Sequence, residues 1–86
     1  MTLRYRIRVD SRVVKELRRL PVSDAERLIE SIECLANNPR PPGARKLVNQ
    51  PGWRIRIGSY RVLYEINDSN KVVTVYRAGH RREVYR

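Results

Sequence analysis

A strict alternation of side chains over residues 53–66 constrains the fold of this chain more than any other feature. Trp53, Ile55 and Ile57 alternate with two arginines, and beyond Gly58-Ser59 bulky apolar side chains again occupy every second position. A period of two is typical of a strand with one buried face, and Gly-Ser is a favoured two-residue hairpin turn. The segment therefore predicts a pair of antiparallel strands.

The two-residue turn also predicts which side chains face each other across the hairpin. The opposed apolar pairs are Trp53–Tyr64, Ile55–Val62 and Ile57–Tyr60. We expect these pairs to form a core that helices cover. The same register places Arg56 directly opposite Arg61, with Arg54 nearby, on the exposed side of the sheet. Facing like charges destabilise a sheet, so this patch calls for a compensating anion.

The N-terminal part of the chain predicts one strand and one short helix. Bulky side chains alternate with arginines over residues 3–9, which is typical of a strand. Asp10 or Ser11 can cap the helix that follows, and Pro21 ends it. The apolar side of this helix consists of Val13, Leu17 and Leu20.

A second helix follows, and after it a loop and a third strand of a meander. Ser23 and Glu26 have the spacing of a capping box. The apolar stripe behind them consists of Ala25, Leu28, Ile29, Ile32, Leu35 and Ala36. The proline-rich segment 39–43 predicts a surface loop, and a turn at 67–70 leads into a strand over 72–76.

The elements together predict an α+β fold with the order β-α-α-β-β-β. The simplest packing lays two N-terminal helices on one face of a mainly antiparallel four-stranded sheet, whose other face stays open. At 86 residues, we expect the whole chain, residues 1–86, to form one domain.

The charge of the chain predicts a polyanionic partner. Its 19 Lys and Arg exceed its 9 Asp and Glu, which gives a formal net charge of +10. Residues 1–38 carry a net charge of +2 and residues 39–86 a net charge of +8, so attraction to phosphate is concentrated in the second half. A generic solubilising surface usually mixes both signs.

The rare residue types exclude several classes of site. One cysteine, Cys34, cannot form an intramolecular disulfide, and with His80 as the only histidine no Cys/His zinc spacing exists. We therefore expect no metal and no cofactor. No apolar run has the length of a signal peptide or a membrane span, which favours the cytoplasm and no membrane partner.

RNA is the polyanion whose cleavage needs the least from a protein. The sequence has no Walker loop, no GxSxG, no HExxH and no clustered pair of carboxylates. RNA carries its own nucleophile, the 2′-hydroxyl, so a protein can cleave it by orienting the backbone, stabilising charge and moving protons. Arginine forks suit phosphate oxygens. The alternative for each arginine is a solvated strand face.

Two stretches of the sequence resemble a known family over essentially the whole chain. Residues 53–66, WRIRIGSYRVLYEI, and residues 79–85, GHRREVY, preceded by two helices and Lys46-Leu47, resemble the RelE branch of the RelE/ParE toxin superfamily. The resemblance implies a RelE-like, microbial-RNase-like fold. It also implies a type II toxin that enters the ribosomal A site and cleaves mRNA to leave a 2′,3′-cyclic phosphate.

The resemblance also implies roles for individual residues. The catalytic positions of the family fall on Arg54, Arg56, Arg61, Arg81 and Tyr85. Well-known members have lysines in place of the first two arginines. An arginine practically never gives up its proton, so we assign those two arginines to phosphate binding and charge stabilisation. The remaining basic residues predicted to bind RNA are Arg45, Lys46 and Arg82.

Two residues of the C-terminal segment are candidates for moving protons. Tyr85 is the candidate general base, although a phenol with a pKa of about 10 needs the positive field of the arginines to lower that pKa. The alternative is an aromatic packed on the sheet edge. His80 titrates near neutrality and is an alternative proton shuttle, or else a local turn residue. Trp53, Tyr60 and Tyr64 are expected in the core rather than stacked on bases.

The resemblance implies partners and leaves rival functions open. The expected partners are the ribosome with its mRNA and a cognate RelB-like antitoxin, acidic and partly disordered before binding, in a toxin–antitoxin hetero-oligomer. One rival is a ParE-like toxin that inhibits DNA gyrase. The other is a basic RNA-binding module without catalysis.

Overall fold

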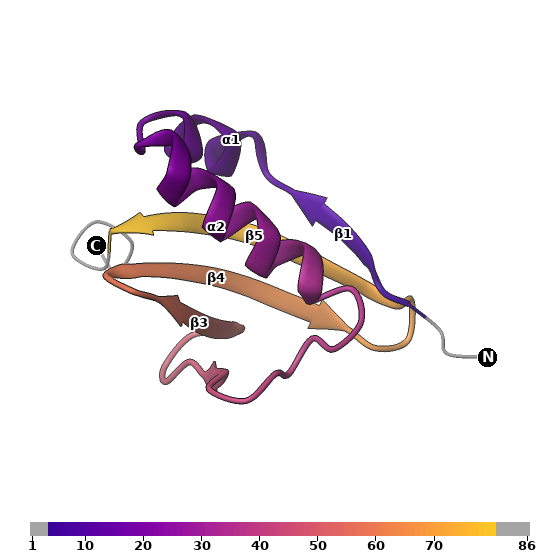
Figure 1. The fold of residues 1–86 in the computed structure, drawn as a ribbon. Helices are drawn as coiled ribbons and strands as arrows, with labels where there is room; N and C mark the ends of the chain where they lie inside the picture. The colour runs from indigo at the N-terminus through magenta and orange to yellow at the C-terminus, as the bar shows by residue number, and fades with distance from the viewer. Residues whose placement is uncertain (1–3, 81–86) are drawn as a thin grey trace.

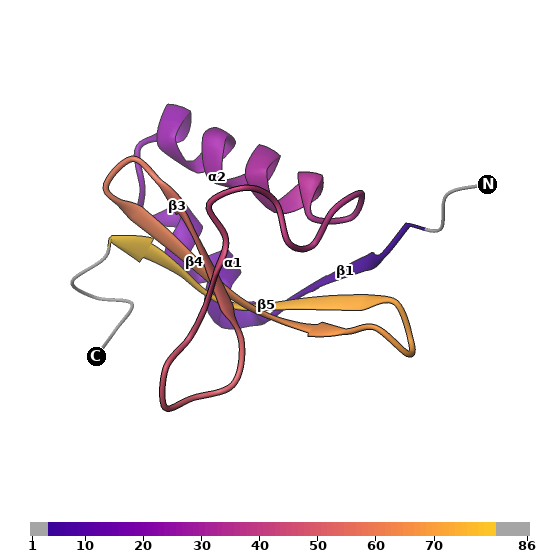
Figure 2. The ribbon, with the colours of Figure 1, turned by 90° about the horizontal axis from the view of Figure 1, so that it is seen from below.

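The computed structural model describes residues 4–80, which form two helices and a mixed sheet (Figure 1). In chain order the elements are β1 (Arg6–Val9), α1 (Ser11–Arg18), α2 (Val22–Cys34), β2 (Arg45–Lys46), β3 (Trp53–Ile57), β4 (Tyr60–Asn67) and β5 (Val72–His80). The strand order is β1-β5-β4-β3-β2, with β1 parallel to β5 and every other pair antiparallel. Figure 2 shows α2 on one side of the strands. The predicted α+β class is confirmed, and so is the placement of both helices between the first strand and a mainly antiparallel group of later strands.

The prediction of four strands was wrong, because the described residues contain a fifth, β2. This two-residue strand pairs with β3 through Arg45 opposite Arg54 and Lys46 opposite Trp53. The loop between them closes with the Leu47 amide donating to the Gly52 carbonyl oxygen at 2.9 Å. Two residues are too few for an alternation to appear in the sequence, so this strand is defined by its partner alone.

Neither predicted side-chain cap forms. Asp10 occupies the N-cap of α1 without a side-chain hydrogen bond, and Ser23 lies inside α2, which begins at Val22. Pro21 is the N-cap of α2, with its carbonyl oxygen accepting from the Ala25 amide at 3.0 Å. The fixed φ of proline is compatible with a helix start, so α2 begins before the Ser23 box can form.

The core lies between the helices and one face of the sheet, as the hairpin register predicts. All three predicted apolar pairs of β3 and β4 are formed. The buried core cluster is Val13, Leu28, Ile32, Leu35, Ile55, Val62, Tyr64, Val73, Val75 and Ala78. Ile29 departs from the predicted stripe with 43% of its surface exposed, because it lies on the edge of the helical face that meets the sheet.

The proline-rich loop is held by Arg40, which connects three segments distant in sequence. Its guanidinium donates to both carboxylate oxygens of Asp68, at 2.9 and 3.3 Å, and lies 5.2 Å from the centre of the Trp53 ring. Hydrogen bonds from Arg40 and Tyr5 lower the pKa of Asp68 to about 2. The predicted loop therefore lacks regular structure but has a defined position against the sheet.

Tyr64 links the core to the same loop and gives the fold an alkaline limit. Its buried hydroxyl donates to the Pro39 carbonyl oxygen at 2.7 Å, and burial raises the pKa of Tyr64 to about 12. Because the folded chain holds this proton more tightly than the unfolded chain, stability falls as pH rises from about 10 toward about 12.

We expect a Tyr64→Phe variant to lack this part of the pH dependence. Between pH 9 and 12 the free energy of unfolding of the unchanged chain should fall by about 2 kcal/mol more than that of the variant. Urea denaturation across this range would measure the difference. At pH 7 the variant should lose only about 1 kcal/mol, from one hydrogen bond. Parallel pH profiles for the two chains would contradict the prediction.

Candidate functional site

Four arginines of β2, β3 and β4 lie on the side of the sheet that faces away from the helices. We call this set the arginine face; it consists of Arg45, Arg54, Arg56 and Arg61. Arg45 stands directly opposite Arg54, and Arg56 directly opposite Arg61. The predicted opposition of Arg56 and Arg61 is confirmed. Two like-charged pairs on neighbouring strands destabilise the sheet unless an anion lies between them.

Arg61 is buried, which corrects the expectation of a fully open face. Only 6% of its surface is exposed, and the next residue on the same side of β4, Leu63, is 2% exposed. The alternation indicated the side on which Arg61 lies but not how much of that side is covered. On its other flank Arg61 pairs with Gly79 of β5, which has no side chain to share the space.

The guanidinium of Arg61 is incompletely satisfied. Within residues 4–80 its buried Nε has no hydrogen-bond partner, and one terminal nitrogen donates at 3.4 Å to the Tyr60 carbonyl oxygen. A buried donor left unpaired costs roughly 1–3 kcal/mol, and more for a charged group. An anionic oxygen bound at this position would remove that cost. The unpaired Nε of Arg61 therefore lowers the stability of the fold and can donate to a bound ligand.

A hollow of about 280 Å³ opens beside the arginine face. Its lining residues are Pro42, Gly43, Arg45, Arg54, Ile55 and Arg56. Of these six described lining residues three are cations and none is acidic, so the hollow attracts anions. Gly43 adopts a φ of +92°, a backbone conformation that residues with a Cβ rarely adopt, so the loop that borders the hollow depends on a glycine here.

Lys46 is not part of the arginine face. It stands opposite Trp53, whose side chain packs on the core side, and it is exposed there. Successive residues of a strand point to opposite sides, so Arg45 and Lys46 cannot both contact one anion on this face. The prediction that both residues bind RNA rested only on two basic residues standing next to each other in the sequence.

His80 is also on the core side of the sheet. It is the last residue of β5 and stands opposite Tyr60, with their ring centres 6.3 Å apart and nearly perpendicular. The alternative of a turn residue was therefore wrong. The Tyr60 hydroxyl donates to Asp24 at 2.8 Å, and this hydrogen bond raises the pKa of Tyr60. One residue of offset from Gly79 turns the His80 side chain away from Arg61.

The three remaining candidates lie outside the described residues: Arg81, Arg82 and Tyr85. The described chain ends one residue after Gly79, the partner of Arg61 in the sheet.

The sequence reasoning missed a charged pair, Glu16 and Arg77, that holds the end of β5 against α1. Arg77 Nε lies 3.0 Å from one carboxylate oxygen of Glu16, and the Ala78 amide donates to the other at 3.0 Å. Both side chains are largely buried. A signal was present, because Glu16 lies between Val13, Leu17 and Leu20 on the apolar stripe of α1. An acidic side chain at such a position indicates a buried partner.

Comparison with known proteins gives matches over nearly the whole chain. Residues 7–85 match the family model of the ParE toxin of the type II toxin–antitoxin system. The toxin–antitoxin complex RelBE2 of Mycobacterium tuberculosis contains a chain with 26% identity and a TM-score of 0.80, covering 91% of this chain and 99% of that one.

Two further solved structures are similar at higher identity. A mutant of the E. coli toxin RelE in the free state has 31% identity and a TM-score of 0.78, with 95% of this chain and 90% of that chain covered. The archaeal RelE–RelB complex of Pyrococcus horikoshii has 30% identity and a TM-score of 0.76, with 94% and 97% covered. In the described part of this chain, no helix has the length and apolar character needed to cross a membrane.

Proposed function

The chain belongs to the RelE/ParE superfamily of type II toxins, and on this premise we propose that it is a ribosome-dependent endoribonuclease that cleaves mRNA in the A site. One observation carries the proposal: Arg61 is buried opposite Arg56 with its Nε unpaired among residues 4–80. A phosphate of RNA supplies the missing acceptor. Inhibition of translation follows from the cut.

The arginine face acts by binding charge that increases during the reaction. The 2′-oxygen attacks the adjacent phosphorus, the bond from phosphorus to the 5′-oxygen breaks, and the leaving 5′-oxygen takes a proton from solvent water, so that a 2′,3′-cyclic phosphate and a 5′-hydroxyl remain. Arg56 and Arg61 stabilise the added negative charge on the phosphorane oxygens. Arg54 holds a neighbouring phosphate, and Arg81 braces the leaving oxygen.

Tyr85 is the proposed general base, which takes the proton of the 2′-hydroxyl. The positive charge of the arginine face lowers the pKa of a nearby phenol toward the working pH. The arginines themselves do not release protons, so they cannot replace it. The position of His80 on the opposite side of the sheet from Arg61 supports Tyr85 over the histidine in this role.

The ribosome and an antitoxin are the proposed partners, in the cytoplasm. A site without a strong base gains most from a substrate already held in line for attack, and the ribosome holds mRNA in a fixed path. Free RNA should therefore be cut slowly. The M. tuberculosis and P. horikoshii relatives were solved as complexes with antitoxins, which supports a cognate RelB-like antitoxin in a hetero-oligomer.

The second candidate function is inhibition of DNA gyrase, which the match to the ParE family model favours. It requires protein contacts with gyrase and no RNA chemistry. Phosphate binding uses the opposed arginines and the unpaired Nε of Arg61 directly, which favours the RNA function. A basic RNA-binding module without catalysis is the third reading.

Primer extension on translated mRNA separates these functions. Added protein should produce cuts within A-site codons, and Tyr85→Phe should lower the cutting rate by about 10²–10⁴-fold, the usual contribution of general acid–base catalysis. Arg27→Gln, an exposed change on α2, is the control and should cut normally. Gyrase inhibition without cuts would establish the ParE-like function instead. RNA binding without cuts and without gyrase inhibition would establish the RNA-binding module without catalysis.

A further inference from the structure

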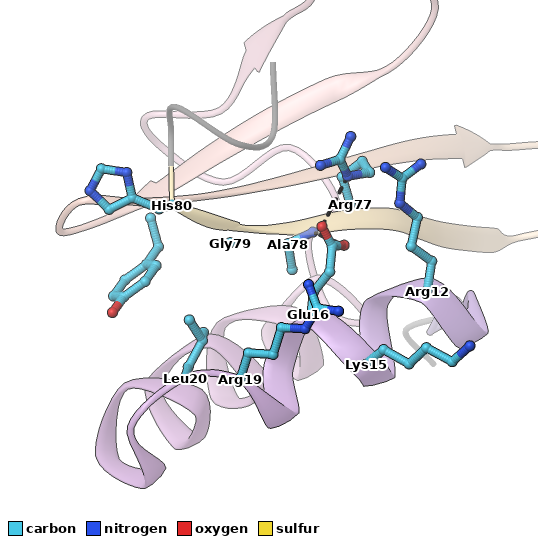
Figure 3. Close-up of a pocket in the computed structure, with 10 residues that line it drawn as sticks. Arg12, Lys15, Glu16, Arg19, Leu20, Arg77, Ala78, Gly79 and His80 are labelled. Carbon is cyan, nitrogen blue, oxygen red and sulfur yellow. Dashed lines mark hydrogen bonds and ion pairs between the residues drawn. The ribbon is translucent and has the colours of Figure 1, made fainter. Parts of the chain in front are cut away.

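A second basic hollow, which we call the α1–β5 pocket, lies between α1 and the end of β5. Its volume is about 640 Å³. Figure 3 shows side chains of α1 and β5 facing each other across it, with Glu16 reaching toward Arg77. Four of its lining residues are cations: Arg12, Lys15, Arg19 and Arg77. The arginine face is separate from this pocket and shares no lining residue with it.

The cations of α1 lack acidic partners within the described part of the chain. Arg12, Lys15 and Arg19 are exposed, and the ion pairs of residues 4–80 do not include them. Among the described residues that line the pocket, Glu16 is the only one with a carboxylate, and its two oxygens are already bound to Arg77 and to the Ala78 amide. The pocket is therefore left with an uncompensated positive charge.

The position of these cations on the helix is unfavourable without a ligand. Arg12 and Lys15 of α1 and Arg19, the C-cap of this helix, are three and four residues apart, so they lie on one stripe and repel each other. Arg12 lies in the first turn, where the helix dipole disfavours a positive charge, and α1 has no acidic residue there. The dipole accounts for Lys15 in the last turn but not for Arg12. A bound anion accounts for the whole stripe.

The edge of β5 favours a nucleic acid over a peptide as this anion. Pairing with β1 ends at Val75, so the remaining part of β5 has no neighbouring strand on that side among the described residues. A peptide strand added to this edge would need its free amides, and the Ala78 amide is taken by Glu16. A phosphate backbone needs only the side-chain cations.

Arg77 places the pocket next to the arginine face. It pairs with Leu63, which lies two residues beyond Arg61 on the same side of β4, and its side chain reaches around the edge of β5 to Glu16. A strand of RNA that leaves Arg61 can thus pass this edge and continue along positive charge.

We infer that the α1–β5 pocket binds the phosphate backbone of single-stranded RNA next to the bond cut at the arginine face, an inference that rests on the proposed function. Arg12 and Arg19 bind phosphates, while Glu16 keeps Arg77 at the edge between the two sites. Single-stranded RNA fits because its flexible backbone can turn around a strand edge, which a duplex cannot do.

The test compares RNAs of two lengths bound to matched charge variants. The probes are 2′-O-methyl RNAs of three and twelve nucleotides, which cannot be cleaved, and anisotropy is measured over a range of salt concentrations. We expect Arg12→Gln/Arg19→Gln to weaken binding of the long RNA about tenfold and to leave the short RNA unchanged. Loss of two phosphate contacts should reduce the slope of log K against log salt by about 1.4.

The control variant, Arg18→Gln/Arg27→Gln, removes the same charge from exposed helix positions outside the pocket. It should bind the long RNA within about twofold of the unchanged chain. Equal weakening by both variants would overturn the inference. The inference would also be overturned if binding of a Glu-rich peptide depended on Arg12 and Arg19 while binding of RNA did not.

The outcomes also separate the inference from the proposed function. If Arg61→Ala abolishes binding of both RNAs and Arg12→Gln/Arg19→Gln changes neither, the proposed function stands and the pocket is not an RNA site. If the unchanged chain binds neither RNA but still cuts translated mRNA, the inference fails and the proposed function stands. If it neither binds RNA nor cuts translated mRNA, both fail.

Discussion

Replacing Arg61 with alanine should lower the rate of mRNA cleavage on the ribosome by about 10²–10³-fold, the usual effect of removing one donor that stabilises transition-state charge. Arg61 is the buried member of the opposed pair, and its Nε has no partner in the described chain. Its charge is least screened by water, so it should matter most to the phosphorane. Single-turnover primer extension with programmed ribosomes would measure the rate.

Arg61→Met separates this loss of activity from a loss of folding. Methionine keeps much of the volume and removes the uncompensated buried charge, so the free energy of unfolding should stay unchanged or rise. Arg56→Ala, at the exposed partner position, should reduce cleavage less than Arg61→Ala does. Full activity in the folded Arg61→Met variant would refute the role of Arg61 in binding phosphate. A rate loss that tracks unfolding would assign Arg61 to the core instead.

Replacing Glu16 with alanine should lower the free energy of unfolding by about 3 kcal/mol, the usual cost of removing one partner of a buried ion pair. The change leaves Arg77 without its carboxylate and the Ala78 amide without its acceptor. Urea denaturation followed by circular dichroism would measure the loss as a lower midpoint with an unchanged slope.

Two variants test the cause of this effect. Glu16→Gln keeps an oxygen for the Ala78 amide and loses the charge, so it should cost less than alanine. Glu26→Ala changes an exposed acidic residue of α2 and should alter stability by less than about 0.5 kcal/mol. The lost acceptor of the Ala78 amide should leave part of this cost in an Arg77→Ala background. A cost for Glu16→Ala that is undiminished in that background would show that the pair is uncoupled and would contradict this account.

Much of the fold could be predicted because its signals are local. The alternation over 53–66 and the Gly58-Ser59 turn predict a register that the structure confirms at every predicted pair. The capping box at Ser23 and the four-strand count were wrong for a common reason: each depends on a neighbour, Pro21 in one case and β3 in the other. A local sequence preference is overridden where an adjacent residue or strand provides other partners for the backbone hydrogen bonds.

The candidate site could be predicted in part. Side chains alternate between the two faces along each strand, and this alternation places Arg54, Arg56 and Arg61 on one face. The same alternation places Lys46 and His80 on the other face. The burial of Arg61 and the capture of Arg77 by Glu16 could not be foreseen, because both depend on contacts between residues far apart in the chain. The roles of Arg81 and Tyr85 stay predictions.

The sequence by itself determined the element types, the hairpin register and therefore which arginines oppose each other, because strand alternation and turn length fix the side on which each residue lies. Only the tertiary structure decided how these charges are used. It buried Arg61 while leaving Arg56 exposed, paired Arg77 with Glu16, and left the cations of α1 around a second pocket. Solvent access and partners determine the energy of a charge, and both are properties of the packed chain.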